Sequence, residues 1–130
     1  MGVSSDGMLY FGFLVAEEDV ELPKWMEGYD YFDYFVLEKA GVSKEAPYEE
    51  RSRVIEACPA ELQTFCSYDY PMYVLAVRGV SKIVSRGKSL EITADDLQVP
   101  QQKIDEFKKW CEASGIKYEE PKWLLCSMLG

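Results

Sequence analysis

The sequence predicts a single α+β domain spanning residues 1–130, with a mostly antiparallel sheet of about 5–6 strands packed by two to three helices. Three observations support this class. Several apolar runs have the length of strands, other stretches place apolar residues at helical spacing, and 48% of the 130 residues are hydrophobic. A chain of this length and composition can bury a core without metal or disulfide support. The predicted order is β-α-α-β-β-β-β-α-β.

The first half is expected to hold one strand and two helices. Residues 8–15 are almost continuously apolar, which predicts a strand buried on both faces, and Gly12 inside it indicates a bulge or a close backbone approach. Residues 29–40 have helical periodicity, with Tyr29, Phe32, Phe35, Val36 and Ala40 on the buried side and Gly41 after the end. A second helix is expected from Pro47 to about residue 57.

The second half is expected to hold most of the sheet. Residues 62–66 predict a short strand, and residues 72–77 are apolar on both alternating faces, which is typical of a central strand. Residues 81–85 and 89–93 predict a hairpin around Gly87. The last helix is expected to carry Phe107 and Cys111 on its buried face before Gly115, and residues 123–129 predict the final strand.

The composition excludes several kinds of chemistry. The chain contains no histidine, so histidine-based triads, Cys–His dyads and histidine-containing metal sites are absent. Its four cysteines are widely spaced, and three of them, Cys58, Cys111 and Cys126, follow apolar residues, which predicts free thiols in a reducing compartment. No apolar run approaches the about 20 residues of a membrane helix. We therefore expect neither a cofactor nor an enzyme, and no membrane association.

The charge distribution indicates an acidic binding surface. Residues 1–70 hold 15 acidic and 5 basic residues, a net charge of −10, whereas residues 71–130 hold 8 and 9. On the helix predicted at 29–40, acidic and tyrosine side chains share the outward side, and such a surface would meet a basic surface of a protein. A simply solvated helix face and a Mg²⁺ site at Asp30 and Asp33 remain alternatives. The candidate partner-binding residues are Glu27, Asp30, Tyr31, Asp33, Tyr34 and Glu38.

A second candidate site is basic. Arg78, Lys82, Arg86 and Lys88 would share one face at strand spacing, and that face could hold the phosphates of a nucleotide signal across the interface of a homodimer. Tyrosine and phenylalanine are not interleaved with these residues, as a nucleic-acid stacking surface would require. Direct binding of nucleic acid is therefore disfavoured, and a solvated edge hairpin is the simpler interpretation.

Three segments resemble a group of small proteins of tailed bacteriophages and prophages. These segments are Met1–Gly7 with the glycine-containing strand after it, the Asp69-Tyr70-Pro71-Met72-Tyr73 stretch, and the ending that begins Glu120-Pro121-Lys122-Trp123. The resemblance implies a phage origin and a location in the bacterial host cytoplasm. It also implies a non-enzymatic accessory role, such as an anti-CRISPR or another anti-defence or host-takeover factor that inhibits a host protein. A nucleotide-binding sponge and a structural or assembly protein of the virion are the alternatives.

Overall fold

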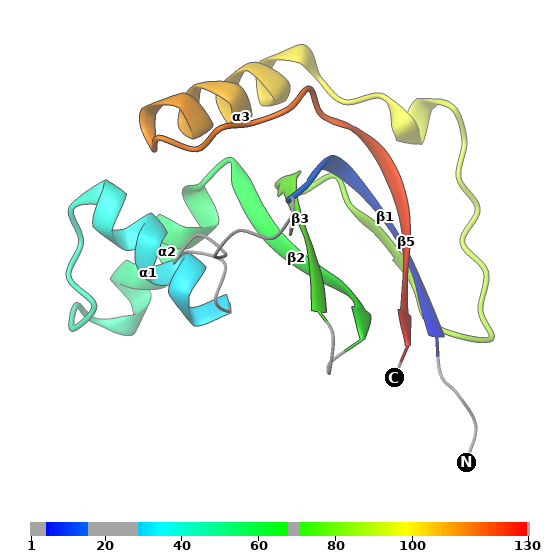
Figure 1. Ribbon diagram of the computed structural model, residues 1–130, viewed down its shortest axis with the longest axis horizontal. Coiled ribbons are helices and arrows are strands. Elements are labelled where there is room, and N and C mark those ends of the chain that lie inside the picture. Colours follow the sequence, from blue (N-terminus) through cyan, green and yellow to red (C-terminus); the bar gives the residue numbers. More distant parts are fainter. Residues whose placement is uncertain (1–4, 16–28, 68–70, 130) are drawn as a thin grey trace.

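The computed structural model describes residues 5–15, 29–67 and 71–129. It confirms the α+β class, with five strands in the sheet and three α-helices among these residues (Figure 1). The elements in chain order are β1 (Ser5–Leu14), α1 (Tyr29–Ala40), α2 (Tyr48–Ala57), β2 (Ala60–Ser67), β3 (Pro71–Val77), β4 (Lys82–Val84), a 3₁₀ turn (Asp95–Leu97), α3 (Gln101–Ala113) and β5 (Lys122–Leu129).

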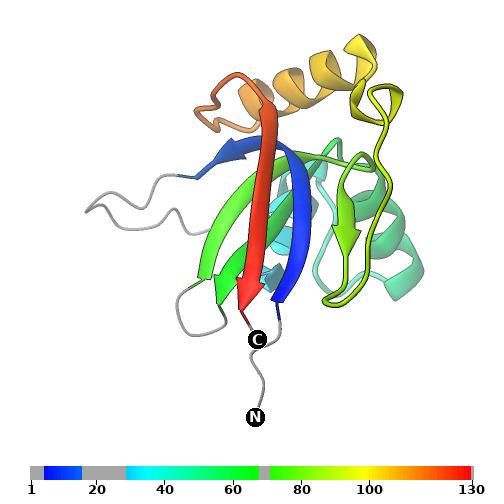
Figure 2. The same ribbon diagram turned by 90° about the vertical axis from the view of Figure 1, so that its right-hand side faces the viewer.

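The sheet curves until four of its strands form a closed ring. β1 pairs with β5 from Ser5 opposite Leu129 to Gly12 opposite Lys122, and the end of β1 pairs with β3. β3 pairs along its length with β2, whose last two residues pair with β5 and so complete the ring. The β2–β5 ladder is parallel and the other four are antiparallel, as the prediction of a mostly antiparallel sheet requires. β4 pairs with β1 beside the ring (Figure 2).

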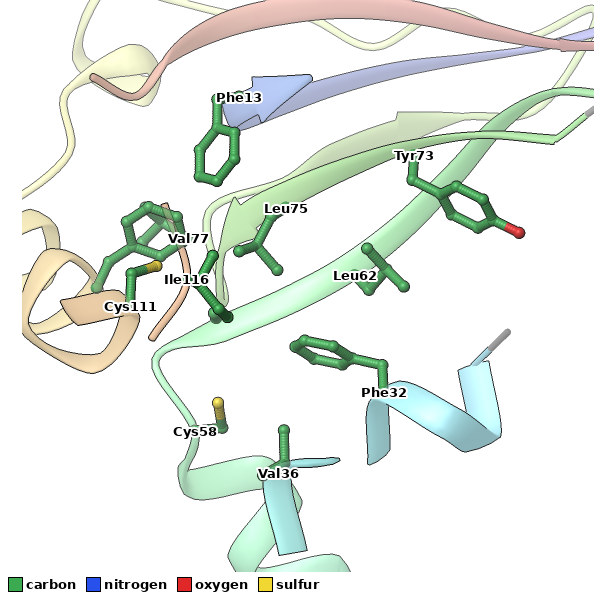
Figure 3. Close-up of a cluster of buried hydrophobic side chains, with 12 residues drawn as sticks. Phe13, Phe32, Val36, Cys58, Leu62, Tyr73, Leu75, Val77, Cys111 and Ile116 are labelled. Carbon is green, nitrogen blue, oxygen red and sulfur yellow. The ribbon is translucent and has the colours of Figure 1, made fainter. Parts of the chain in front are cut away.

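Closure of the ring gives the sheet two buried faces. Inside the ring, Met8 and Tyr10 of β1 pack with Val74, Ala76 and Cys126. The outer face packs against helices, and this larger cluster includes side chains of β3, α1 and α3 (Figure 3). Residues 73–77 of β3 are all buried because alternate side chains enter the two clusters. The prediction of a central strand at 72–77 is therefore confirmed.

Gly12 lies at the point where β1 approaches β3. A Cβ atom added to it would lie 2.1 Å from the carbonyl oxygen of Leu75 and 2.7 Å from the Cα atom of Ala76. No side chain fits in this space, so the close approach predicted for Gly12 is confirmed. The glycine allows β1 to cross from its long ladder with β5 to its short ladder with β3.

The predicted hairpin after residue 80 is wrong in its second strand. β4 occupies Lys82–Val84, but residues 89–93 form no strand. β4 pairs with β1 instead of with residues 89–93. Leu90 and Ile92 of that segment are exposed, so they bury no apolar surface against the sheet. The count is therefore five strands rather than six.

Hydrogen bonds between Thr93 and Asp96 close the turn that precedes α3. The Asp96 carboxylate accepts a hydrogen bond from the Thr93 N–H at 2.9 Å, and the Thr93 hydroxyl accepts one from the Asp96 N–H at 3.3 Å. The bond from the Thr93 N–H to the carboxylate is the main cause that lowers the pKa of Asp96. The reciprocal pair fixes the 3₁₀ turn before the helix. α3 then buries Phe107 and Cys111 on the predicted face and ends at Ala113. Gly115 follows two residues later, with a φ of 75° that favours glycine.

Candidate functional site

The structure confirms the helix on which the acidic candidate site depends. α1 spans Tyr29–Ala40, as predicted. Tyr34 and Glu38 are exposed on it, and Asp33 is half-buried. Glu27 lies outside the described residues, and the side chains of Asp30 and Tyr31 do as well. Three of the six candidates therefore have described positions, two of them facing solvent.

The buried surface of α1 differs from the sequence prediction at two positions. Leu37, which the periodicity places beside the outward tyrosines, is 1% exposed, whereas Ala40, predicted on the buried side, is exposed. α1 packs on the sheet through Phe32 and Val36, and Leu37 faces a second helix, α2. Periodicity predicts one buried face, but α1 is covered from two directions.

A hollow of about 260 Å³ lies between α1 and α2 and contains part of the predicted site. We call it the helix-pair hollow. Tyr34 on α1 is 37% exposed and Tyr48 at the start of α2 is 74% exposed, so two phenol rings stand at its edge. The lining residues are Asp33, Tyr34, Leu37, Tyr48, Arg51, Ser52, Ile55 and Glu56.

Sequence reasoning missed Tyr48 as a site residue. The signal was present, because Tyr48 is the first residue of α2 and directly follows Pro47. Side chains in a helix lean toward the preceding turn, and a first residue has no such turn to pack on. An aromatic residue at this place is therefore exposed unless another element covers it.

Basic side chains from the same segment contact the two tyrosine rings. The Lys44 ammonium lies 4.9 Å from the centroid of the Tyr34 ring, and the Arg51 guanidinium lies 5.9 Å from that of Tyr48. Arg51 also donates from Nε to the carbonyl of Ala46 at 3.0 Å. Exposed cation–π contacts of this kind contribute about 0.5–1 kcal/mol each. They orient the two rings at the edge of the hollow.

The charge of this region is mixed but remains acidic. Residues 29–57 contain seven carboxylates and four basic side chains, a net charge of −3. The sequence predicts carboxylates and tyrosines on the outward side of α1. The structure adds Arg51 to the lining. A complementary surface on a partner would therefore be mainly basic, with an acidic or neutral group opposite Arg51.

The basic candidate site is not assembled as the strand spacing predicts. Arg78 donates from Nε to the Cys58 carbonyl at 2.8 Å and from Nη2 to the Ala60 carbonyl at 3.2 Å, and its Nη1 lies 3.8 Å from the Glu61 carboxylate. Arg78 therefore holds the α2–β2 connection against the end of β3. Because Arg78 is engaged in these contacts, a nucleotide site formed by Lys82, Arg86 and Lys88 would lack its guanidinium as a phosphate ligand.

The other three basic residues lie on β4 and in the turn after it. Lys82 is half-buried, and Arg86 and Lys88 are exposed. The Lys88 N–H donates to the Ser85 carbonyl at 3.1 Å, so the chain turns there and does not continue as a strand. The single strand face predicted for all four residues is therefore wrong, because β4 includes only Lys82 among them.

The cysteines behave as the sequence predicts at three positions. Cys58, Cys111 and Cys126 are buried free thiols, and Figure 3 shows the first two. Burial raises the pKa of all three thiols, and it raises that of Cys111 to about 12. Cys66 is exposed and has a φ of 80°, which is unusual for a residue other than glycine.

Within residues 5–15, 29–67 and 71–129, no three histidine, cysteine or carboxylate side chains lie together as metal ligands.

Comparison with family models, with curated proteins and with solved structures found no match to this chain. In the described part of the chain, no helix has the length and apolar character needed to cross a membrane.

Proposed function

We propose that this chain is a non-enzymatic phage accessory protein that binds a basic surface of a host protein through the helix-pair hollow and inhibits that protein. The phage resemblance supplies the setting, a bacterial host cytoplasm, and the class, an anti-defence factor such as an anti-CRISPR or another host-takeover factor. The observation that carries the binding role is the hollow itself, where exposed Tyr34 and Tyr48 stand beside the carboxylates of Asp33 and Glu56.

The residue types in the hollow fit protein recognition. Tyrosine combines a large apolar ring with a hydroxyl that donates and accepts hydrogen bonds, and it is enriched among residues that dominate binding energy. Carboxylates around such rings accelerate association with a basic partner and reject acidic ones. Leu37 and Ile55 give the floor an apolar component.

The role of α2 in the fold also supports this proposal. None of its side chains is fully buried, although Val54 and Ile55 pack against the edge of the large core. Tyr48 and Glu56 of α2 are exposed and can contact another molecule. A short helix of this kind depends on packing against a neighbour for its stability. The neighbour of α2 is α1, and Ile55 of α2 and Leu37 of α1 line the same hollow.

The test is affinity purification from host cells with the tagged full chain, followed by mass spectrometry and measurement of the dissociation constant for the captured protein. We expect a basic protein to be captured, with affinity that falls as salt rises. The variant Tyr48→Ala with Glu56→Lys should weaken binding at least about tenfold, the loss expected when an interface hot spot is removed.

The matched control reverses carboxylates elsewhere. Glu91→Lys with Glu119→Lys changes exposed residues outside α1 and α2 and should leave the dissociation constant within about twofold. If the Tyr48 and Glu56 variant captures the same proteins with wild-type affinity, the helix-pair hollow is not the binding site. A salt-independent interaction would likewise contradict the charge-based part of the proposal.

A further inference from the structure

The interior of the strand ring contains sulfur side chains from both ends of the chain. Met8 of β1 and Cys126 of β5 are Cα partners in the ladder between these strands. Met128 lies two residues after Cys126 on the same strand, so it points to the same face. Met8 and Cys126 belong to the buried cluster inside the ring, and Met128 packs against it. We call Met8, Cys126 and Met128 the sulfur cluster.

The strand register brings these three sulfur atoms within reach of one another. Side chains directly opposite in an antiparallel pair have Cβ atoms about 4.5–5.5 Å apart, and diagonal neighbours lie about 7–8 Å apart. Met8 and Cys126 are a direct pair, and Met8 and Met128 are diagonal neighbours. Methionine side chains are long and unbranched, so both thioethers can approach the Cys126 thiol. A single small ion between them can therefore contact all three sulfur atoms.

The sulfur cluster is buried but can be reached from one end of the ring. Met8 is 6% exposed and Cys126 is 7% exposed. The Tyr10 hydroxyl donates a hydrogen bond to the Met8 sulfur at 3.1 Å, which helps to orient the thioether. Met128 is only half-buried and lies where β5 meets the last residues of β2, at the lower end of the ring in Figure 2. This end gives an ion a route from solvent to the cluster.

The donor atoms of the sulfur cluster select the kind of ion. Thioether and thiolate sulfur are soft ligands that favour Cu(I), whereas Zn²⁺ prefers cysteine, histidine and carboxylate ligands. Charge favours the same ion, because one thiolate and one Cu(I) form a neutral pair. A divalent ion would instead leave a net positive charge in an apolar interior, which costs free energy. A soft monovalent metal ion therefore fits the cluster.

We propose that the sulfur cluster is a binding site for Cu(I), with the Cys126 thiolate and the Met8 and Met128 thioethers as ligands. On binding, the S–H bond of Cys126 breaks, its proton leaves to water and a Cu–S bond forms, with no change in oxidation state. The site lies in the strand ring and shares no residue with the helix-pair hollow. This inference therefore goes beyond the proposed function and does not rest on it.

The test measures Cu(I) binding by the full chain in ascorbate under nitrogen, in competition with the chelator bicinchoninate. Cys66→Ser is the reference protein, because the exposed Cys66 thiol could bind copper by itself. We expect this reference to take one Cu(I) per chain from the chelator and to hold it against excess Zn²⁺. X-ray absorption at the copper edge should show sulfur ligands only.

Three substitutions in the reference protein test the ligands one at a time. Cys126→Ala removes the thiolate and should lower the affinity for Cu(I) at least about 100-fold. Met8→Leu and Met128→Leu preserve the side-chain volume and should each lower it at least about tenfold, because even residues behind metal ligands contribute about 10- to 100-fold. If Cys126→Ala does not fold, the two methionine variants still decide the question.

Two matched controls change sulfur residues outside the sulfur cluster. Met72 is a methionine of β3 that is 37% exposed and does not belong to the cluster inside the ring. Cys111 is a buried thiol of the large core. Met72→Leu and Cys111→Ala should therefore leave the dissociation constant for Cu(I) within about twofold.

Three outcomes would overturn the inference. The Cys66→Ser reference could fail to take Cu(I) from the chelator, the Met8 and Met128 variants could retain the reference affinity, or Zn²⁺ could bind as tightly as Cu(I). None of these measurements uses a partner protein. Their result is therefore independent of whether the helix-pair hollow captures a host protein.

Discussion

α2 and α3 are two helices with similar beginnings and different roles. Each follows a proline, Pro47 or Pro100, and neither has a side-chain cap on its first turn. α3 inserts Phe107 and Cys111 into the large core, both 0% exposed, whereas α2 inserts no fully buried side chain. The comparison separates a helix that anchors the large core from a helix whose side chains all remain at least partly exposed.

This difference divides the molecule into two regions. The strand ring and α3 are close-packed, so they tolerate few substitutions. α2 and the outward side of α1 carry exposed tyrosines and carboxylates, and changes there should affect binding more than stability. The predictions below test this division, beginning with the largest expected effect.

Gly12→Ala should prevent folding or destabilise the protein by more than about 4 kcal/mol. The new Cβ atom would overlap the backbone of Leu75 within the strand ring, where neither strand can move without breaking its ladder. Urea denaturation measures the effect. The control is Gly87→Ala, at a glycine with a φ of 75° and open space around it, which should cost about 1–2 kcal/mol. Equal losses for the two variants would show that the crowding at Gly12 is unimportant.

Phe107→Ala should cost about 3–5 kcal/mol because it leaves a cavity in the large core. Ile55→Ala on α2 removes a half-buried side chain and should cost about 1 kcal/mol, mostly from lost apolar contact. The same denaturation experiment compares them directly. A loss at Ile55 that approaches the loss at Phe107 would mean that α2 belongs to the stabilising region after all.

The four thiols should separate into one reactive and three protected groups. Cys66 is exposed, whereas burial raises the pKa of Cys58, Cys111 and Cys126, so at neutral pH these three remain protonated as well as inaccessible. Labelling with Ellman's reagent should modify one thiol quickly in the native protein and all four in urea. Fast native labelling of two or more thiols would indicate that the cores on the two faces of the sheet open readily.

Asp96 should give the smallest effect, visible only in acid. Its hydrogen bonds with Thr93 lower its pKa in the folded protein. Its stabilising contribution is therefore complete above the ordinary carboxyl pKa and is lost as the pH falls below about 4 through the lowered folded value. Comparing the acid dependence of unfolding for wild type and Asp96→Asn measures this. The wild type should lose more stability than the variant in that range, and identical acid profiles would contradict the role of the turn.

Much of the fold follows from local sequence patterns. The extent of α1, the buried face of α3 and the glycine after α3 at Gly115 were predicted, and each depends on residues adjacent in the chain. Gly12 predicted a close backbone approach, but which strand approaches it was decided by the tertiary structure. Periodicity and glycine chemistry act over a few residues, so one sequence is enough to show them. Of the candidate site, the positions of Tyr34 and Glu38 on the outward side of α1 were predictable for the same reason.

The tertiary structure decided everything that depends on a second segment. Leu37 is buried although its position in the helix faces outward, because α2 covers it. Residues 89–93 have the composition of a strand, but β4 pairs with β1 and not with them. Arg78 donates hydrogen bonds to carbonyls that lie 18 and 20 residues earlier in the chain. Ala40, Ala57 and Ala113 end three separate helices, and packing brings them around one hollow. No pattern within a single segment specifies that meeting.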